Sequence, residues 1–207
     1  MNVGPTVFVV DDDVAVVDSL STLLTNHGYH VECFQSAEQF LQNVGGDRPG
    51  CLLLDIRMPG TDGLELLQQL VKKNGLRPTV ILSGYADTPT VVKAIKIGAT
   101  NFLEKPVRPQ ELIQTIHDAL ELDRQQRQQD QATLRSKALL QELTDQELQV
   151  LAHLDRGLNN RQVAEELQLS LRTVQFRLSS LYKKLGVSTK PEAIAIYRRA
   201  KGLPFRS

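Results

Sequence analysis

The first 120 residues repeat one pattern five times: a short apolar run is followed by a longer segment whose apolar residues recur at helical spacing. The first run, residues 6–10, is β-branched and aromatic, as in a strand buried on both faces. Strands that alternate with helices favour a parallel sheet covered by helices on both faces, so we predict a doubly wound α/β fold. The predicted strands are 6–10, 29–33, 51–54, 79–82 and 101–103, and the helices after the first are 36–44, 62–73, 88–97 and 107–120.

Polar side chains with complementary chemistry follow four of these predicted strands. They are Asp11, Asp12 and Asp13 after the first strand, Asp55 after the third, Ser83 after the fourth and Lys105 after the fifth. Because ligands bind beyond the carboxyl ends of parallel strands, we expect these groups to gather there. Crowded carboxylates repel one another, and Mg²⁺ with oxygen ligands relieves that repulsion. A metal, a hydroxyl and an ammonium around one carboxylate suit phosphoryl transfer, with Asp55 as the nucleophile.

The role of Asp13 stays open at this point. An aspartate that directly precedes a helix is as suitable for capping that helix as for binding a metal.

Four blocks around these residues resemble the signature blocks of receiver domains. They are residues 9–13 (VVDDD), 54–60 (LDIRMPG), 82–84 (LSG) and 102–106 (FLEKP). The resemblance covers about residues 5–120 and implies a five-stranded parallel sheet with the flavodoxin-like order 2-1-3-4-5. It also implies a cis peptide bond between Lys105 and Pro106.

The same resemblance implies a role for each site residue. Asp55 is the expected phosphorylation site, and Mg²⁺ is expected to bind Asp11, Asp12, Asp55 and the backbone carbonyl of Arg57. Ser83 and Lys105 are expected to contact the phosphoryl group, and Phe102 matches the aromatic residue that moves when these domains switch. We also expect Tyr85 and the Arg57 side chain to hinder attacking water and prolong the phosphorylated state.

The charge of the chain is unevenly distributed, although its formal net charge is zero. Residues 1–120 contain 9 Lys and Arg against 14 Asp and Glu, whereas residues 139–207 contain 11 against 7. An acidic half joined to a basic half suggests a different partner for each, with nucleic acid the candidate for the basic half.

Residues 121–138 separate the two halves. This segment is rich in glutamine, contains no Gly or Pro and sustains no heptad pattern. It is consistent with an exposed helix that extends the preceding one, or with a partly ordered tether. We therefore predict three parts: a receiver at 1–120, a polar linker at 121–138 and a second domain at 139–207.

The second domain is predicted to be small and entirely helical. Thr144 and Glu147 fit a capping box, Asn160 is placed to cap a short second helix, and Ser170 is placed to cap the third. The third helix has an apolar stripe of Val174, Leu178, Leu181 and Leu185. Its predicted outward face carries Arg172, Thr173, Gln175, Phe176, Ser179, Ser180 and Lys183.

A short helix, a tight turn and a longer helix with a polar face match the helix-turn-helix plan, in which the longer helix enters the major groove of DNA. Hydroxyls and lysine suit phosphates, whereas glutamine and arginine read base edges. Charge alone would fit an ordinary surface helix equally well.

Residues 143–151, 157–164, 169–174 and 184–187 resemble the LuxR-type helix-turn-helix domain. With the receiver, the whole chain resembles response regulators of the FixJ and NarL class. This implies DNA contacts by Arg172, Thr173, Gln175, Phe176, Ser179 and Lys183. The sequence departs from the family where Arg177 replaces a common histidine and where positions 175 and 179 lack a basic residue. Fewer cationic contacts predict weaker non-specific binding, so DNA binding is expected to depend on dimerisation.

The resemblance implies transcriptional control by phosphorylation. A sensor histidine kinase is the expected phosphoryl donor, residues 88–118 the expected homodimer surface, and duplex DNA and RNA polymerase the further partners. The chain is expected not to be an enzyme beyond phosphotransfer to its own Asp55 and autodephosphorylation. Two rival functions stay open: an Mg²⁺-dependent phosphatase with an aspartyl nucleophile, and an interaction module whose second domain binds protein.

The sequence also predicts where the chain resides. Its apolar runs are too short to cross a bilayer, and the first residues lack the basic leader and apolar core of a secretory signal. Cys33 and Cys51 lie in strand-like apolar runs, and we expect both to be reduced core residues of a cytoplasmic protein.

Overall fold

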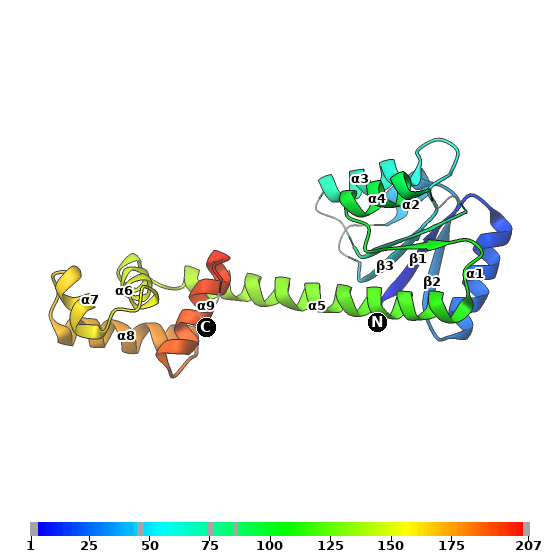
Figure 1. Ribbon diagram of the computed structural model, residues 1–207. Helices are drawn as coiled ribbons and strands as arrows, with labels where there is room; N and C mark the ends of the chain where they lie inside the picture. Colours follow the sequence, from blue (N-terminus) through cyan, green and yellow to red (C-terminus); the bar gives the residue numbers. More distant parts are fainter. Residues whose placement is uncertain (1–3, 45–47, 74–76, 85–86, 205–207) are drawn as a thin grey trace. The chain divides into compact units, whose positions relative to one another are not determined.

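The chain forms two compact units, Met1–Gln126 and Arg127–Ser207, in the computed structural model (Figure 1). The structure describes residues 4–44, 48–73, 77–84 and 87–204. Within these ranges, no helix is both long enough and apolar enough to span a membrane.

The first unit contains a five-stranded sheet in which every neighbouring pair of strands is parallel. Its strands are β1 (Thr6–Val10), β2 (His30–Phe34), β3 (Gly50–Leu54), β4 (Thr79–Ser83) and β5 (Asn101–Glu104). Their order is β2-β1-β3-β4-β5, which confirms the predicted fold and topology. β1, β3 and β4 are buried along their whole length, as expected of central strands covered on both faces.

Helices cover both faces of this sheet (Figure 1). They are α1 (Val14–Asn26), α2 (Ala37–Asn43), α3 (Gly63–Lys72), α4 (Thr88–Ile97) and the first part of α5 (Pro109–Gln141). On one face, leucines and isoleucines of α1 and α5 pack against Val7, Val9 and Leu53. On the other, residues of α2, α3 and α4 pack against Phe8, Val10 and Leu54. Successive strand residues point to opposite faces, so these two cores follow from the alternation along β1 and β3.

The sequence prediction was wrong in two details of the edge strand β2. It begins and ends one residue later than predicted, and Cys33 is exposed although we expected it in the core. β2 pairs only with β1, so its outer edge has no neighbouring strand and its side chains are less covered by the rest of the unit. Cys51, in the central strand β3, is buried as expected.

Helix α5 runs without a break from Pro109 to Gln141 and includes residues 121–138, for which the sequence left helix and tether open. Asp123, on this helix, is buried and accepts a hydrogen bond from the backbone N–H of Gly50 at 3.0 Å.

The second unit is helical throughout its described residues, as predicted. It combines the end of α5 with α6 (Asp145–Asp155), α7 (Asn160–Glu166), α8 (Leu171–Leu185) and α9 (Lys190–Lys201). The predicted capping box of Thr144 and Glu147 begins α6, and Ser170 caps α8. The cap of α7 is Asn159 rather than Asn160, because Asn159 accepts from two backbone N–H groups of the first turn. The predicted stripe of Val174, Leu178, Leu181 and Leu185 is buried in the core of this unit.

Candidate functional site

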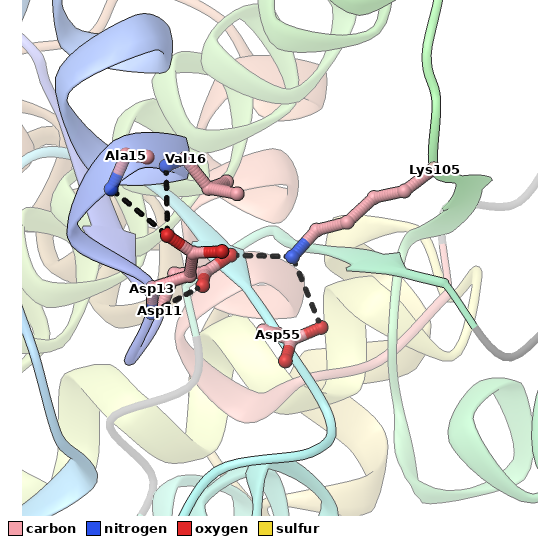
Figure 2. Close-up of polar contacts among 6 residues, drawn as sticks. All are labelled: Asp11, Asp13, Ala15, Val16, Asp55 and Lys105. Atoms are coloured by element: carbon pink, nitrogen blue, oxygen red, sulfur yellow. Dashed lines mark hydrogen bonds and ion pairs between the residues drawn. The ribbon is translucent and has the colours of Figure 1, made fainter.

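Three carboxylates meet beyond the carboxyl ends of β1 and β3. Single oxygens of Asp11, Asp12 and Asp55 lie within 4.8 Å of one another. Asp11 and Asp55 are buried, whereas Asp12 is exposed. Figure 2 shows Lys105 reaching this cluster from the end of β5, with its Nζ 2.6 Å from Asp11 and 3.4 Å from Asp55. Ser83 is buried at the end of the intervening strand β4.

Backbone contacts fix the position of Asp55. Its N–H donates to the carbonyl of Val10 at 2.9 Å, which continues the pairing of β3 with β1 by one residue. Helix α3 begins next to Asp55, where the N–H of Gly63 donates to the Ile56 carbonyl at 2.9 Å. A Cβ atom at position 63 would lie 2.0 Å from the backbone oxygen of Asp55. Glycine is therefore required where the helix touches this backbone.

The charges of the cluster are only partly balanced by Lys105. Burial raises the pKa of Asp55, Lys105 lowers it and Asp11 raises it, and the net result is a raised pKa. Repulsion between carboxylates and loss of water both disfavour the ionised form, so a cation at this point is favourable. Three carboxylate oxygens are ligands of the kind that Mg²⁺ prefers.

Asp13 caps helix α1. Its Oδ1 accepts from the N–H groups of Ala15 at 2.9 Å and Val16 at 3.4 Å, and its own N–H donates to Asp11 at 3.0 Å (Figure 2). The alternative that the sequence left open is therefore decided in favour of the cap, and Asp13 helps to orient Asp11.

Two further predicted residues of this site lie on β5 and in the loop after β3. Phe102 is half-buried on β5 and packs against the core under α2, α3 and α4. Arg57 is exposed in the loop after β3. The Lys105–Pro106 peptide bond is cis, as the resemblance implies. Tyr85 lies outside the described residues.

One contact next to the site had no sequence signal. Glu38, on α2, accepts a hydrogen bond from the N–H of Thr61 at 3.3 Å and thereby contacts the loop that follows Asp55. The side-chain hydrogen bond with Thr61, with further hydrogen bonds from its own backbone and Ser36, lowers the pKa of Glu38 to about 2. The two residues are 23 positions apart, and neither belongs to a local pattern that would have joined them.

A second candidate site is the outer face of α8. Leu171, Arg172, Gln175, Phe176, Ser179 and Lys183 are exposed there, and Phe176 is 74% exposed. Thr173 is half-buried, and its Oγ1 lies 2.7 Å from the capping Ser170 Oγ. Ser180 was expected on this face, but its hydroxyl donates to the buried Glu147 at 2.6 Å, so that expectation was wrong.

Comparison with protein families matches both units. Residues 7–117 match the response regulator receiver domain, and residues 141–197 match the bacterial regulatory proteins of the luxR family. The chain is 38% identical to the response regulator protein TmoT of Ectopseudomonas mendocina over 195 residues, which cover 94% of this chain and 89% of TmoT. It is 34% identical to the transcriptional regulatory protein FixJ of Bradyrhizobium diazoefficiens over 201 residues, which cover 94% of this chain and 95% of FixJ.

Solved structures resemble the chain over almost its whole length. The response regulator StyR matches with a TM-score of 0.83 at 38% identity, covering 95% of this chain and 99% of StyR. Full-length FixJ from B. japonicum matches with a TM-score of 0.59 at 33% identity, covering 97% of this chain and 98% of FixJ.

Proposed function

This chain belongs to the response regulators that join a receiver domain to a LuxR-type DNA-binding domain, and we propose that phosphorylation of Asp55 controls its binding to DNA. The family consists of transcriptional regulators, and its receiver domain implies a histidine kinase as partner. The observation that carries the proposal is the cluster of Asp11, Asp12 and Asp55 with Lys105 against it.

The acidic cluster fits Mg²⁺ through its donor set, with Asp11, Asp12, Asp55 and the backbone carbonyl of Arg57 as the proposed ligands. When bound, the metal would supply positive charge against the carboxylates and the incoming phosphoryl oxygens.

In the proposed reaction, a carboxylate oxygen of Asp55 attacks the phosphorus of a phosphohistidine. The new oxygen–phosphorus bond forms as the bond from phosphorus to the histidine nitrogen breaks, and that nitrogen leaves with the bonding pair. Lys105 contacts both Asp11 and Asp55, and its ammonium is the proposed partner of the phosphoryl group. The hydroxyl of Ser83 is its other proposed contact, and attack by water later returns Asp55 to the free carboxylate.

The proposed conformational change after phosphorylation begins at Ser83 and Phe102. Movement of Ser83 toward the phosphoryl group would leave space into which Phe102 turns, changing the surface formed by residues 88–118. Two apolar side chains of this surface, Val92 and Ile95, are exposed on α4 and available to a second copy of the chain. A phosphorylated state that favours this contact would shift the population to dimers.

The dimer would place two α8 helices on paired half-sites of duplex DNA, as symmetric helix-turn-helix proteins do. The proposed DNA contacts are Arg172, Thr173, Gln175, Phe176, Ser179 and Lys183. RNA polymerase is the proposed downstream partner, and the cytoplasm is the proposed location. The proposed parts of the chain are the receiver at 1–120, the helical linker at 121–138 and the DNA-binding domain at 139–207.

Phosphorylation with a small-molecule donor tests the proposal. Wild type and Asp55→Asn are incubated with acetyl phosphate, with and without Mg²⁺, and their intact masses are compared. We expect a phosphoryl adduct on wild type that requires Mg²⁺ and is missing from Asp55→Asn. Asp13→Asn is a matched control, because Asp13 contacts Asp11 through its backbone N–H, which the substitution keeps, and asparagine can also cap α1, so the adduct should persist. An adduct that persists in Asp55→Asn, or none in wild type, would contradict the proposal.

A further inference from the structure

Several polar side chains of α8 that resemble base-reading groups are already engaged within the second unit. Thr173 Oγ1 lies 2.7 Å from the Oγ of Ser170, in the cap of the helix. Ser179 donates its hydroxyl proton to the carbonyl of Gln175 at 3.1 Å, and Arg177 donates to Gln146 of α6 at 2.7 Å. The hydroxyl proton of Ser179 can reach a base only if this hydrogen bond breaks, and the contact with Gln146 holds the Arg177 guanidinium against α6.

Phe176 and Gln175 are the two central side chains of the exposed face. Phe176 has the largest exposed fraction of the big apolar side chains within the described ranges. An aromatic ring exposed to water adds nothing to the hydrophobic core below it, whereas contact with a partner would remove its apolar surface from water, which is favourable. Gln175 precedes it and is also exposed, and its side-chain amide carries both a donor and an acceptor.

The floor of the DNA major groove offers one apolar group, the C5 methyl of thymine, which phenylalanine contacts favourably. Adenine offers an acceptor and a donor side by side, a pair that a glutamine amide matches with two hydrogen bonds. Consecutive residues of a helix are separated by about 100° of rotation, so two neighbouring side chains on the outer face reach adjacent positions in a groove.

We infer that Phe176 is a specificity-determining residue that seats against a thymine methyl, with Gln175 reading an adenine next to it. α8 is thereby a reader of A·T pairs at the centre of each half-site. This rests on the proposed function of α8 as the helix that enters the major groove, and it adds which bases that helix selects.

The test begins with DNA that the protein itself selects. Full-length chain phosphorylated with acetyl phosphate and Mg²⁺ is used to enrich duplexes from a random-sequence pool. The enriched duplex is then resynthesised with each thymine replaced by deoxyuridine, which lacks only the methyl group, at symmetric positions of the half-sites. Because this change is made in the DNA, the folding of the protein does not enter the result.

Affinities of wild type and Phe176→Ala are measured on each thymine and uracil duplex. We expect uracil at one position per half-site to weaken wild type about 15-fold, because the dimer loses two buried methyl groups of about fourfold each. Phe176→Ala should bind the thymine duplex more weakly and make no distinction between thymine and uracil at that position. Leu134→Ala removes another exposed apolar side chain, outside α8, and should behave as wild type.

Two results would overturn the inference while leaving DNA binding intact. In one, wild type binds every uracil-substituted duplex as tightly as the parent. In the other, Phe176→Ala keeps the full preference for thymine. If no duplex is enriched from the pool, the proposed DNA-binding function of this domain fails, and the inference fails with it.

Discussion

Asp55 is held among opposing influences on its charge. Burial and the neighbouring Asp11 raise its pKa, whereas Lys105 lowers it. The Nζ of Lys105 is closer to Asp11, at 2.6 Å, than to Asp55, at 3.4 Å. In this arrangement Asp55 is the less compensated of the two buried carboxylates, which suits the one that we propose accepts a phosphoryl group.

At the residue scale, the close contact of Gly63 with the Asp55 backbone allows a prediction about stability and phosphorylation. Gly63→Ala places a Cβ atom 2.0 Å from the backbone oxygen of Asp55, so the start of α3 or the Asp55 loop must move. We expect the free energy of unfolding of the receiver to fall by roughly 1–3 kcal/mol, as for other overpacked positions, and the rate of phosphorylation to fall with it.

Urea unfolding and intact-mass kinetics with acetyl phosphate measure these two effects. Gly84→Ala is the matched control, since a Cβ atom there meets no other atom within 4 Å although the residue follows Ser83 directly. Equal stability of the two variants would show that Gly63 is not needed for the contact.

That these side chains gather in one place was predictable from the sequence, because each lies at or just beyond the end of a strand and the carboxyl ends of parallel strands converge. The spacing did not predict whether Asp13 caps α1 or binds a metal, because it follows two other aspartates and directly precedes the helix. It also did not predict the contact of Glu38 with Thr61, which depends on how α2 lies against the loop after β3.

At the scale of elements, Glu147 joins α6 to α8. Its carboxylate accepts from Thr144 in the capping box, from Ser180 at 2.6 Å and from Lys184 at 2.7 Å. The same residue therefore caps the start of α6 and holds α8 against it. Because Ser180 and Lys184 are one helical turn apart on α8, the contact fixes the rotation of that helix as well as its distance.

Glu147 also predicts a pH dependence. Burial alone would raise its pKa, but the hydrogen bonds from Lys184, Ser180 and Thr144 outweigh burial and lower the pKa to about 2. A depressed pKa stabilises the folded state above the ordinary value of 4.5, and this contribution is lost as pH falls toward about 2. At neutral pH we expect Glu147→Gln to cost about 1.5 kcal/mol, the scale of a hydrogen bond to a charged group.

Hydrogen exchange of α8 amides, compared between wild type and Glu147→Gln at the same pH, measures this cost. The difference should shrink as pH falls from about 5 to about 2, first as the unfolded chain is protonated near pH 4.5 and then as folded Glu147 is protonated near pH 2. A difference that stays constant over this range would mean that the charge of Glu147 does not hold α8.

The turn before α8 gives a second prediction at this scale. Gln168 has a φ of 53° and is the one residue other than glycine with a positive φ within the described ranges. A residue with a side chain is strained by roughly 1–2 kcal/mol in the left-handed region. Glycine removes this strain, but it loses more conformational entropy on folding, so only part of the strain energy is gained as stability. We expect Gln168→Gly to raise the free energy of unfolding by roughly 0.5–1 kcal/mol and Gln168→Val to lower it, as measured by urea unfolding. A loss of stability on Gln168→Gly would contradict the assigned backbone strain.

The elements themselves were predictable to within about two residues where periodicity and caps agree. The exceptions have physical causes. Cys33 is exposed because β2 is an edge strand, and strand order does not follow from periodicity. Ser180 lies near the boundary between the two faces of α8, where spacing along the helix does not reveal its partner on α6.

At the scale of the whole molecule, two units of different net charge share the continuous helix α5. The composition of residues 121–138 permits both a helix and a tether, so the extent of α5 was not predictable from this segment alone. The buried contact of Asp123 with Gly50 shows that α5 still packs against the receiver beyond residue 120. This contact joins residues 73 positions apart, and no sequence pattern around Gly50 predicts it as the partner of Asp123.

The proposed dimer surface makes a prediction for the phosphorylated protein. Ile95 is 47% exposed on α4, and Ile95→Glu places a charge in the surface that we propose pairs with a second copy. We expect this variant to accept a phosphoryl group normally and to stay monomeric, because an unpaired charge is costly to bury. Leu134→Glu alters an even more exposed apolar residue outside residues 88–118 and should dimerise as wild type. Sedimentation velocity measures both, and dimers of phosphorylated Ile95→Glu would exclude Ile95 from the interface.

The central claim is that phosphorylation of Asp55 controls DNA binding, and one measurement tests it most directly. The affinity of the full chain for its enriched duplex is compared between the phosphorylated and unphosphorylated protein, with Asp55→Asn treated identically. We predict binding at least about tenfold tighter after phosphorylation, within the usual range of coupling between two sites, and no change in Asp55→Asn. Equal affinity in the two states of wild type would contradict the account, since the receiver would then carry no information to the DNA-binding domain.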